Sequence, residues 1–182
     1  MSYLSNFISS SKSNSDDEYY TLLKDIDEEL SHYKSFFVGK TIYCNCDNPI
    51  KSNFVQWFYM RFNILHLKRI IVTSYNSAIY NGGGIIGIPI SLQGTQKTID
   101  ISKEIEKDVR KLNGNGDFRS DECIELLKQA DIVVTNPPFS LFGDFISMLN
   151  DYDKDFVIIG PLNCITLQKP FQMMINDRMR CG

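Results

Sequence analysis

A short apolar strand that ends in two prolines constrains this chain more than any other feature. Residues 132–134 are Ile-Val-Val, a run of β-branched side chains typical of a parallel strand covered on both faces. Pro137 and Pro138 then remove two backbone donors and fix φ, and they push Asn136 toward an extended conformation. The sequence therefore predicts an α/β fold, with a loop rich in hydrogen-bond acceptors after this strand.

The acceptors of this loop suit one kind of chemistry. An amino group on an aromatic base is a weak nucleophile, because its lone pair is delocalised into the ring. The side-chain oxygen of Asn136 and the carbonyl of Pro137 can each accept one amine hydrogen, and Phe139 can stack on the base. The alternative is a simple turn, since Asn-Pro often opens one. The aromatic residue and the apolar helix expected directly afterwards favour the functional interpretation.

The chain resembles a known family at this point. Asn-Pro-Pro-Phe at 136–139 looks like motif IV of amino-group methyltransferases, and the longer pattern is similar to the EcoRI-type adenine-specific DNA methyltransferases. The matching segments are residues 43–54, 67–75, 116–120 and 158–166. The resemblance implies a three-layer Rossmann-like fold with a mostly parallel sheet. It also implies methyl transfer from S-adenosylmethionine to N6 of a flipped adenine in DNA.

The expected site residues fall in two groups. The target amine is expected to meet Asn136, Pro137, Pro138 and Phe139. A loop between a strand and a helix is where an open α/β sheet binds ligands, so the loop after the strand predicted at 41–45 is a second candidate. With the resemblance, the expected cofactor-binding residues are Asn45, Asp47, Asn48, Pro49, Ser52, Tyr75, Asp117 and Phe118. The loop lacks glycine, and Ser74, Tyr75 and Asn76 stand where an acid usually binds the ribose.

Composition limits the other possibilities. Hydrophobic residues make up 43% of the 182, which is enough for a globular core. No apolar run approaches the roughly 20 residues of a membrane span, so we expect no membrane partner and a cytoplasmic location. Five cysteines and two histidines give no disulfide framework and no metal site, and Cys44 and Cys46 are expected on one face of a strand. A net charge of −3 argues against tight duplex binding by this chain alone.

The chain is expected to form one catalytic core over residues 19–182, after a flexible tail at 1–18. Further predictions are an insertion hairpin at about 81–100, a helix over 103–112 and a strand at 156–160. The resemblance implies a seven-stranded sheet, and only four or five strands are predicted here. The fold is therefore expected to be incomplete and to need a missing carboxyl-terminal segment or a second chain.

Two other functions fit the same residues. One is an amino-group methyltransferase that acts on RNA or on a protein glutamine, because the Asn-Pro-Pro-Phe tetrad suits any planar amine or amide. The other is a truncated remnant that binds the cofactor or a partner chain without catalysis. The acidic pI of about 5.4 favours this second alternative over a tight duplex binder.

Overall fold

The computed structural model describes residues 22–75, 77–83 and 101–181, and a six-stranded sheet lies at its centre. The elements in chain order are α2 (Leu23–Ser31), α3 (Lys34–Phe37), β1 (Thr41–Asn45), α4 (Asn53–Arg61), β2 (Arg69–Thr73), β3 (Ala78–Gly82), α5 (Ile101–Glu106), β4 (Arg110–Lys111), α6 (Asp121–Gln129), β5 (Ile132–Thr135), η1 (Phe139–Leu141), α7 (Phe142–Asp151), β6 (Asp155–Ile158), η2 (Leu162–Thr166) and α8 (Gln168–Ile175).

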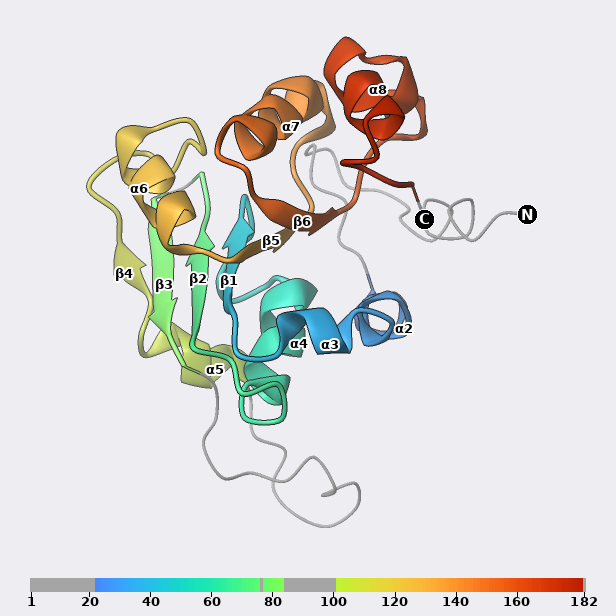
Figure 1. Cartoon of the computed structure of the whole chain (residues 1–182). Helices are drawn as coiled ribbons and strands as arrows, with labels where there is room; N and C mark the ends of the chain where they lie inside the picture. The colour runs from blue at the N-terminus through green and yellow to red at the C-terminus, as the bar shows by residue number, and fades with distance from the viewer. Residues whose placement is uncertain (1–21, 76, 84–100, 182) are drawn as a thin grey trace.

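The strand order is β4-β3-β2-β1-β5-β6 (Figure 1). The pairs β2–β1, β1–β5 and β5–β6 are parallel, whereas β3 and β4 are added antiparallel beyond β2. The chain leaves β1 toward β2 on one side and later returns to β5 on the other side. The carboxyl ends of β1 and β5 therefore flank a point where the strand order reverses, which is where open α/β sheets bind ligands.

Helices cover both faces of the sheet, which confirms the three-layer α/β fold (Figure 1). On one face, α2, α3, α4 and α5 pack against Ile42, Cys44, Ile70, Val72 and Val134. On the other face, α6 and α7 pack against Tyr43, Ile71 and Val133. Alternate residues of β1, β2 and β5 thus enter opposite layers, and this explains why their sequences are apolar throughout.

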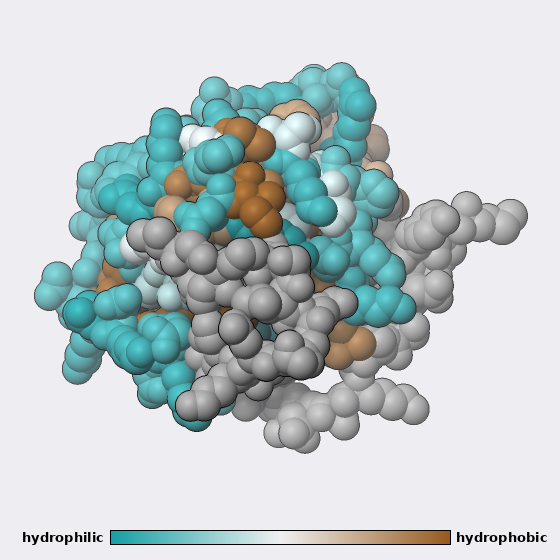
Figure 2. Space-filling view, turned by 90° about the horizontal axis from the view of Figure 1, so that it is seen from below, coloured by the Kyte–Doolittle hydropathy of each residue, from teal (hydrophilic) through white to brown (hydrophobic). Residues whose placement is uncertain are grey.

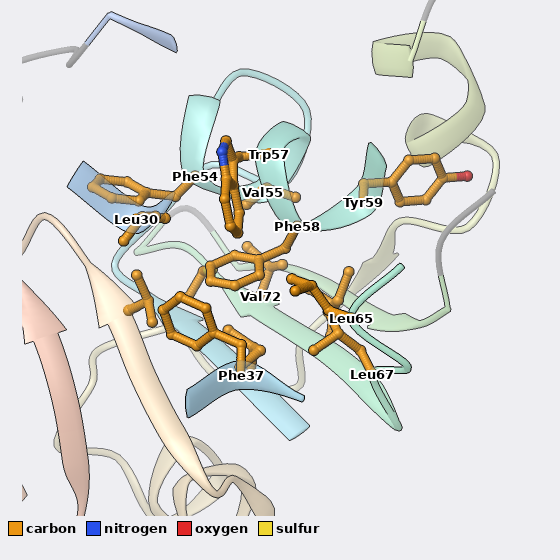
Figure 3. Packing of buried hydrophobic residues seen from close by; sticks show 14 of the residues in the cluster. Leu30, Phe37, Phe54, Val55, Trp57, Phe58, Tyr59, Leu65, Leu67 and Val72 are labelled. Atoms are coloured by element: carbon orange, nitrogen blue, oxygen red, sulfur yellow. The ribbon is translucent and has the colours of Figure 1, made fainter. Parts of the chain in front are cut away.

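Aromatic side chains from α3 and α4 dominate the first layer (Figure 3). The ring of Phe58 packs edge to face on Phe37 and on Trp57, with centroid distances of 5.1 Å and 5.0 Å. Outside this cluster, Asp27 of α2 accepts from Trp57 Nε1 and from Arg61 Nη2, both at 2.8 Å. The aromatic contacts thus hold α3 on α4, and the contacts of Asp27 hold α2 on α4.

Most of the predicted elements are confirmed. The strands at 41–45 and 69–73 and the strand beginning at Ile132 are present, and Ser52 caps α4 as it accepts from Val55 N. The strand predicted at 156–160 spans Asp155–Ile158. The tail at 1–18 and most of the hairpin at 81–100 lie outside the described residues.

Two predictions from the sequence are wrong. The helix expected over 103–112 ends at Glu106, because Arg110 pairs with Ile79 and Lys111 with Ala78 to form β4. Cys44 and Cys46 do not share a face. Cys44 packs in the layer with α4, whereas Cys46 follows the end of β1 with φ at 71° and packs against the opposite layer.

The described surface combines hydrophilic areas with exposed hydrophobic side chains. The face in Figure 2 is mainly hydrophilic where described residues are drawn, with smaller hydrophobic patches between the polar ones. No helix among the described residues is long and apolar enough to cross a membrane. Several large hydrophobic side chains are nevertheless exposed near the carboxyl end of the described chain, namely Leu162, Ile165, Leu167, Phe171 and Ile175.

Candidate functional site

A buried polar network joins the carboxyl ends of β1, β2 and β5. Tyr43 Oη and Thr73 Oγ1 share a hydrogen bond of 2.8 Å, and Thr73 Oγ1 lies 3.4 Å from Asn45 Oδ1. Thr135 Oγ1 lies within hydrogen-bond distance of the Asn45 carbonyl and of Asp47 Oδ2. Polar side chains are seldom buried this deeply unless they hold a particular geometry, so this edge of the sheet is the first candidate site.

The loop from β1 to α4 is held by its own polar side chains. Asn48 Oδ1 accepts from the backbone N–H groups of Ile50 and Lys51, both at 3.0 Å. Ser52 donates to Asp47 Oδ1 at 2.7 Å and accepts from Val55 N as the cap of α4. Pro49 is buried in the turn. Helix α4 therefore begins at the same edge of the sheet as the polar network, and its amino terminus can bind a negative group there.

The Asn-Pro-Pro-Phe segment directly follows this network. Asn136 comes immediately after Thr135 and is half-buried, with its Oδ1 atom shielded from solvent. Pro137 is buried, and the Pro138 carbonyl accepts from Leu141 N at 3.0 Å, which closes the first turn of η1. Phe139 begins η1 and is half-buried. The loop is thus rigid, as the two prolines predict.

Asp117 lies in the loop before α6. Its Oδ1 accepts from Arg119 Nε at 3.0 Å and its Oδ2 accepts from Arg119 Nη2 at 2.8 Å. The hydrogen bonds from Arg119 lower the pKa of the Asp117 carboxyl, so this group is ionised at neutral pH. Arg119 Nη1 also lies 3.6 Å from Asp144 Oδ2 of α7, so one guanidinium connects the Asp117 loop with the helix that follows the Asn136 loop.

Two other predicted residues have different environments. Phe118 is buried and packs edge to face on Phe145 of α7, at a centroid distance of 5.1 Å. This ring serves the core, and a cofactor contact for it stays a prediction. Tyr75 follows β2 and is 69% exposed, which leaves its ring available for a ligand.

The structure brings the predicted residues of the first loop to the same sheet edge as the Asn136 loop. Asp47, Ser52 and Asn45 join the network directly, and the backbone of the 116–117 loop packs on Ser74 and Tyr75. Sequence reasoning missed Thr135, Thr73 and Arg119. The available signal was a threonine at the ends of the buried strands β2 and β5 and an arginine two residues after Asp117.

A family model described as adenine-specific methyltransferase EcoRI matches residues 7–182. The chain belongs to this family. The match includes every strand of the sheet and both loops of the network. The sequence resemblance at 136–139 and the fold around it therefore have one explanation, descent from an EcoRI-type adenine-specific methyltransferase.

Three relatives of the chain are named as type II methyltransferases. The chain is similar to type II methyltransferase M.EcoRI of Escherichia coli, with 39% identity over 178 residues, covering 94% of this chain and 53% of the relative. It is 44% identical over 143 residues to M.MgeORF184P of Mycoplasma genitalium, covering 79% and 40%. M.MpnI of Mycoplasma pneumoniae shares 36% over 176 residues, covering 97% and 50%. The chain thus spans about half the length of these relatives or less. No solved structure matches it.

Proposed function

We propose that this chain carries the cofactor site and the amine site of a site-specific DNA methyltransferase that modifies N6 of adenine. The observation that carries the proposal is the placement of residues 136–139 beside the β1–α4 loop, where the strand order of the sheet reverses. The description of the matching family, adenine-specific methyltransferase, favours an adenine base over a protein glutamine as the target. A cytoplasmic location belongs to the same proposal.

The residues of the network fit S-adenosylmethionine, the methyl donor that this proposal assigns. Asn45 Nδ2 is fully buried and has no hydrogen-bond partner among the described residues, so it can donate to a bound ligand. The amino terminus of α4 suits the negative methionine carboxylate. The ionised Asp117 retains lone pairs that can accept from the adenine amino group. When bound, the cofactor supplies an activated methyl group.

The chain contributes alignment in this reaction. Asn136 Oδ1 and the Pro137 carbonyl accept the two hydrogens of the target amine, which holds its nitrogen toward the methyl group. The amine would lose one proton to water once it had received the methyl group that a bound cofactor would supply. Phe139 stacks on the flipped base. None of these steps requires a strong base, which suits a loop that has only neutral acceptors.

Calorimetric titration with S-adenosylmethionine tests the cofactor site. We expect one-to-one binding by the wild-type chain, loss of binding in Asp117→Asn and retained binding in Asn136→Ala. Asp108→Asn is the matched control, because Asp108 is an exposed aspartate in the turn between α5 and β4. A folded wild-type chain that does not bind the cofactor would contradict the proposal.

We further propose that the outer edge of β6, which has no partner strand among the described residues, pairs with another polypeptide segment, either from a second chain or from a longer form of this one. β6 is the last strand of the sheet. A pocket of about 830 Å³ lies beside it, with Phe36, Phe156 and Ile165 among its lining residues. In two of the relatives, the part that does not match this chain is about as long as the part that does. An edge strand presents a row of unpaired N–H and C=O groups, so a partner segment suits this edge.

Amide hydrogen exchange tests the pairing residue by residue. Ile159 N donates to Thr135 O of β5, so the alternating N–H groups of Phe156 and Ile158 point away from β5. We expect the unmatched part of M.EcoRI, added as a separate polypeptide, to slow exchange at Phe156 and Ile158 only. Unchanged exchange at these two amides under saturating conditions would exclude pairing at this edge.

A further inference from the structure

Thr135 occupies the boundary between the two loops of the site. It is the last residue of β5, it is fully buried, and Asn136 follows it directly. Its Oγ1 atom is within hydrogen-bond distance of the Asn45 carbonyl and of Asp47 Oδ2. The hydroxyl has one hydrogen, so it donates to one of these acceptors at a time.

Asp47 connects this hydroxyl with two other parts of the fold. Its N–H donates to the Thr73 carbonyl at 3.1 Å, which ties it to the end of β2. Its Oδ1 accepts from Ser52 Oγ at 2.7 Å, which ties it to the cap of α4. The Thr135 hydroxyl is the side-chain contact that continues from this hub into the Asn136 loop. Hydrogen bonds to a carboxylate are shorter and stronger than those between neutral groups, so the hub resists deformation.

From this geometry we infer that Thr135 is a positioning residue, whose hydroxyl fixes the β1–α4 loop relative to the Asn136 loop. The inference rests on the proposed function, because it assigns the cofactor to the first loop and the amine to the second. Methyl transfer needs the two reactants in one geometry, and small displacements lower the rate strongly. Thr135 touches neither reactant and acts through Asp47 and through its own backbone link to Asn136.

Three variants distinguish the effect of the Thr135 hydroxyl from the effect of side-chain packing. Thr135→Val keeps the shape and removes the donor, whereas Thr135→Ser keeps the donor and removes a methyl group. Thr41→Val is the matched control, because Thr41 is a buried threonine at the opposite end of β1. We expect Thr135→Val to weaken S-adenosylmethionine binding by about tenfold or more, with Thr135→Ser and Thr41→Val within about threefold of wild type.

Amide exchange without any ligand provides the readout that is independent of the proposed function. In Thr135→Val, exchange is expected to accelerate at Asp47, at Ser52, at Asn136 and in residues 139–141. Thr41→Val is expected to leave exchange at these amides unchanged. A wild-type chain that does not bind the cofactor would contradict the proposed function, and the exchange pattern would still decide the role of Thr135.

The inference is overturned if Thr135→Val matches wild type in both affinity and exchange. It is equally overturned if Thr135→Ser loses as much as Thr135→Val, since the hydroxyl would then be irrelevant. Should Thr135→Val fail to fold, Asp47→Asn changes the same hydrogen bond from its acceptor side. That variant must accelerate exchange at Asn136 and in residues 139–141, and unchanged exchange at these amides rejects the inference.

Discussion

Gly116 packs directly on the backbone of Ser74, so that a Cβ atom on the glycine would lie 1.9 Å from the Ser74 carbonyl oxygen. Gly116 also has φ at +80°, a conformation that side chains with a Cβ rarely adopt. The contact places the residue before Asp117 on the end of β2. The close approach of Asp117 to the end of β2 thus depends on the lack of a side chain at Gly116.

Gly116→Ala is expected to destabilise the fold by more than about 1 kcal/mol and to weaken cofactor binding, because both the backbone conformation and the space are lost. Chemical denaturation and calorimetric titration measure the two effects. Gly114→Ala is the control, since a Cβ there would meet only Glu122 Oε2, at 3.5 Å. Equal effects from the two variants would contradict the role given to the Ser74 contact.

Arg119→Gln is expected to raise the pKa of the Asp117 carboxyl toward its ordinary value of 3.8. Hydrogen bonds from Arg119 lower that pKa in the wild type, so the stabilisation is present above 3.8 and is lost as the pH falls through the lowered value. In the variant, the carboxyl takes up its proton at a higher pH. Carbon NMR titration of the Asp117 carboxyl measures this directly, with Arg110→Gln as the exposed control.

Asp27→Asn is expected to weaken the docking of α2 on α4, by about 1 kcal/mol after allowance for solvent screening. The hydrogen bond from Trp57 is the main cause of the lowered pKa of Asp27, and Arg61 adds to it. The carboxylate therefore stabilises the fold above its ordinary pKa, and this contribution disappears as the pH falls through the lowered value. Urea denaturation across acidic pH tests both points, and Glu28→Gln on the exposed side of α2 should change neither.

Gly143 in α7 and Gly160 after β6 are expected to respond in opposite directions to alanine. In Gly160→Ala, the new methyl group would lie 2.7 Å from Phe142 Cζ, whose ring is fully buried, so a loss of about 1–3 kcal/mol is expected. In Gly143→Ala, the nearest atom is Leu167 Cδ1 at 3.9 Å, and alanine favours α7 by about 0.5–1 kcal/mol. Thermal unfolding of both variants tests this difference in sign.

The parts of the fold that were predicted correctly have strong local signals. The runs at 69–73 and 132–134 are apolar and β-branched, and Ser52 and Ser120 precede helices as caps. The segment at 110–111 is charged and carries no strand signal. Its pairing with β3 decides its structure, and this pairing depends on residues far away in the sequence.

The candidate site likewise has a part that local motifs predict and a part that depends on the fold. Asn136 and Asp47 were predicted because each lies in a short motif after a strand. The hydrogen bond between Thr135 and Asp47 joins residues 88 positions apart, and no local pattern in either segment predicts it. The burial of Phe118 on Phe145 likewise depends on how α7 returns to the sheet.

The junction between α2 and α4 contains the single tryptophan of the chain, with its indole N–H bonded to Asp27. Ultraviolet emission excited at the red edge of the absorption band therefore comes from one place in the molecule. A carboxylate that accepts from the indole and a guanidinium 4.5 Å from the ring centroid both influence the wavelength of that emission. A shift in this emission wavelength, without loss of the helical circular dichroism signal, would indicate that α2 has separated from α4 while the sheet stays intact.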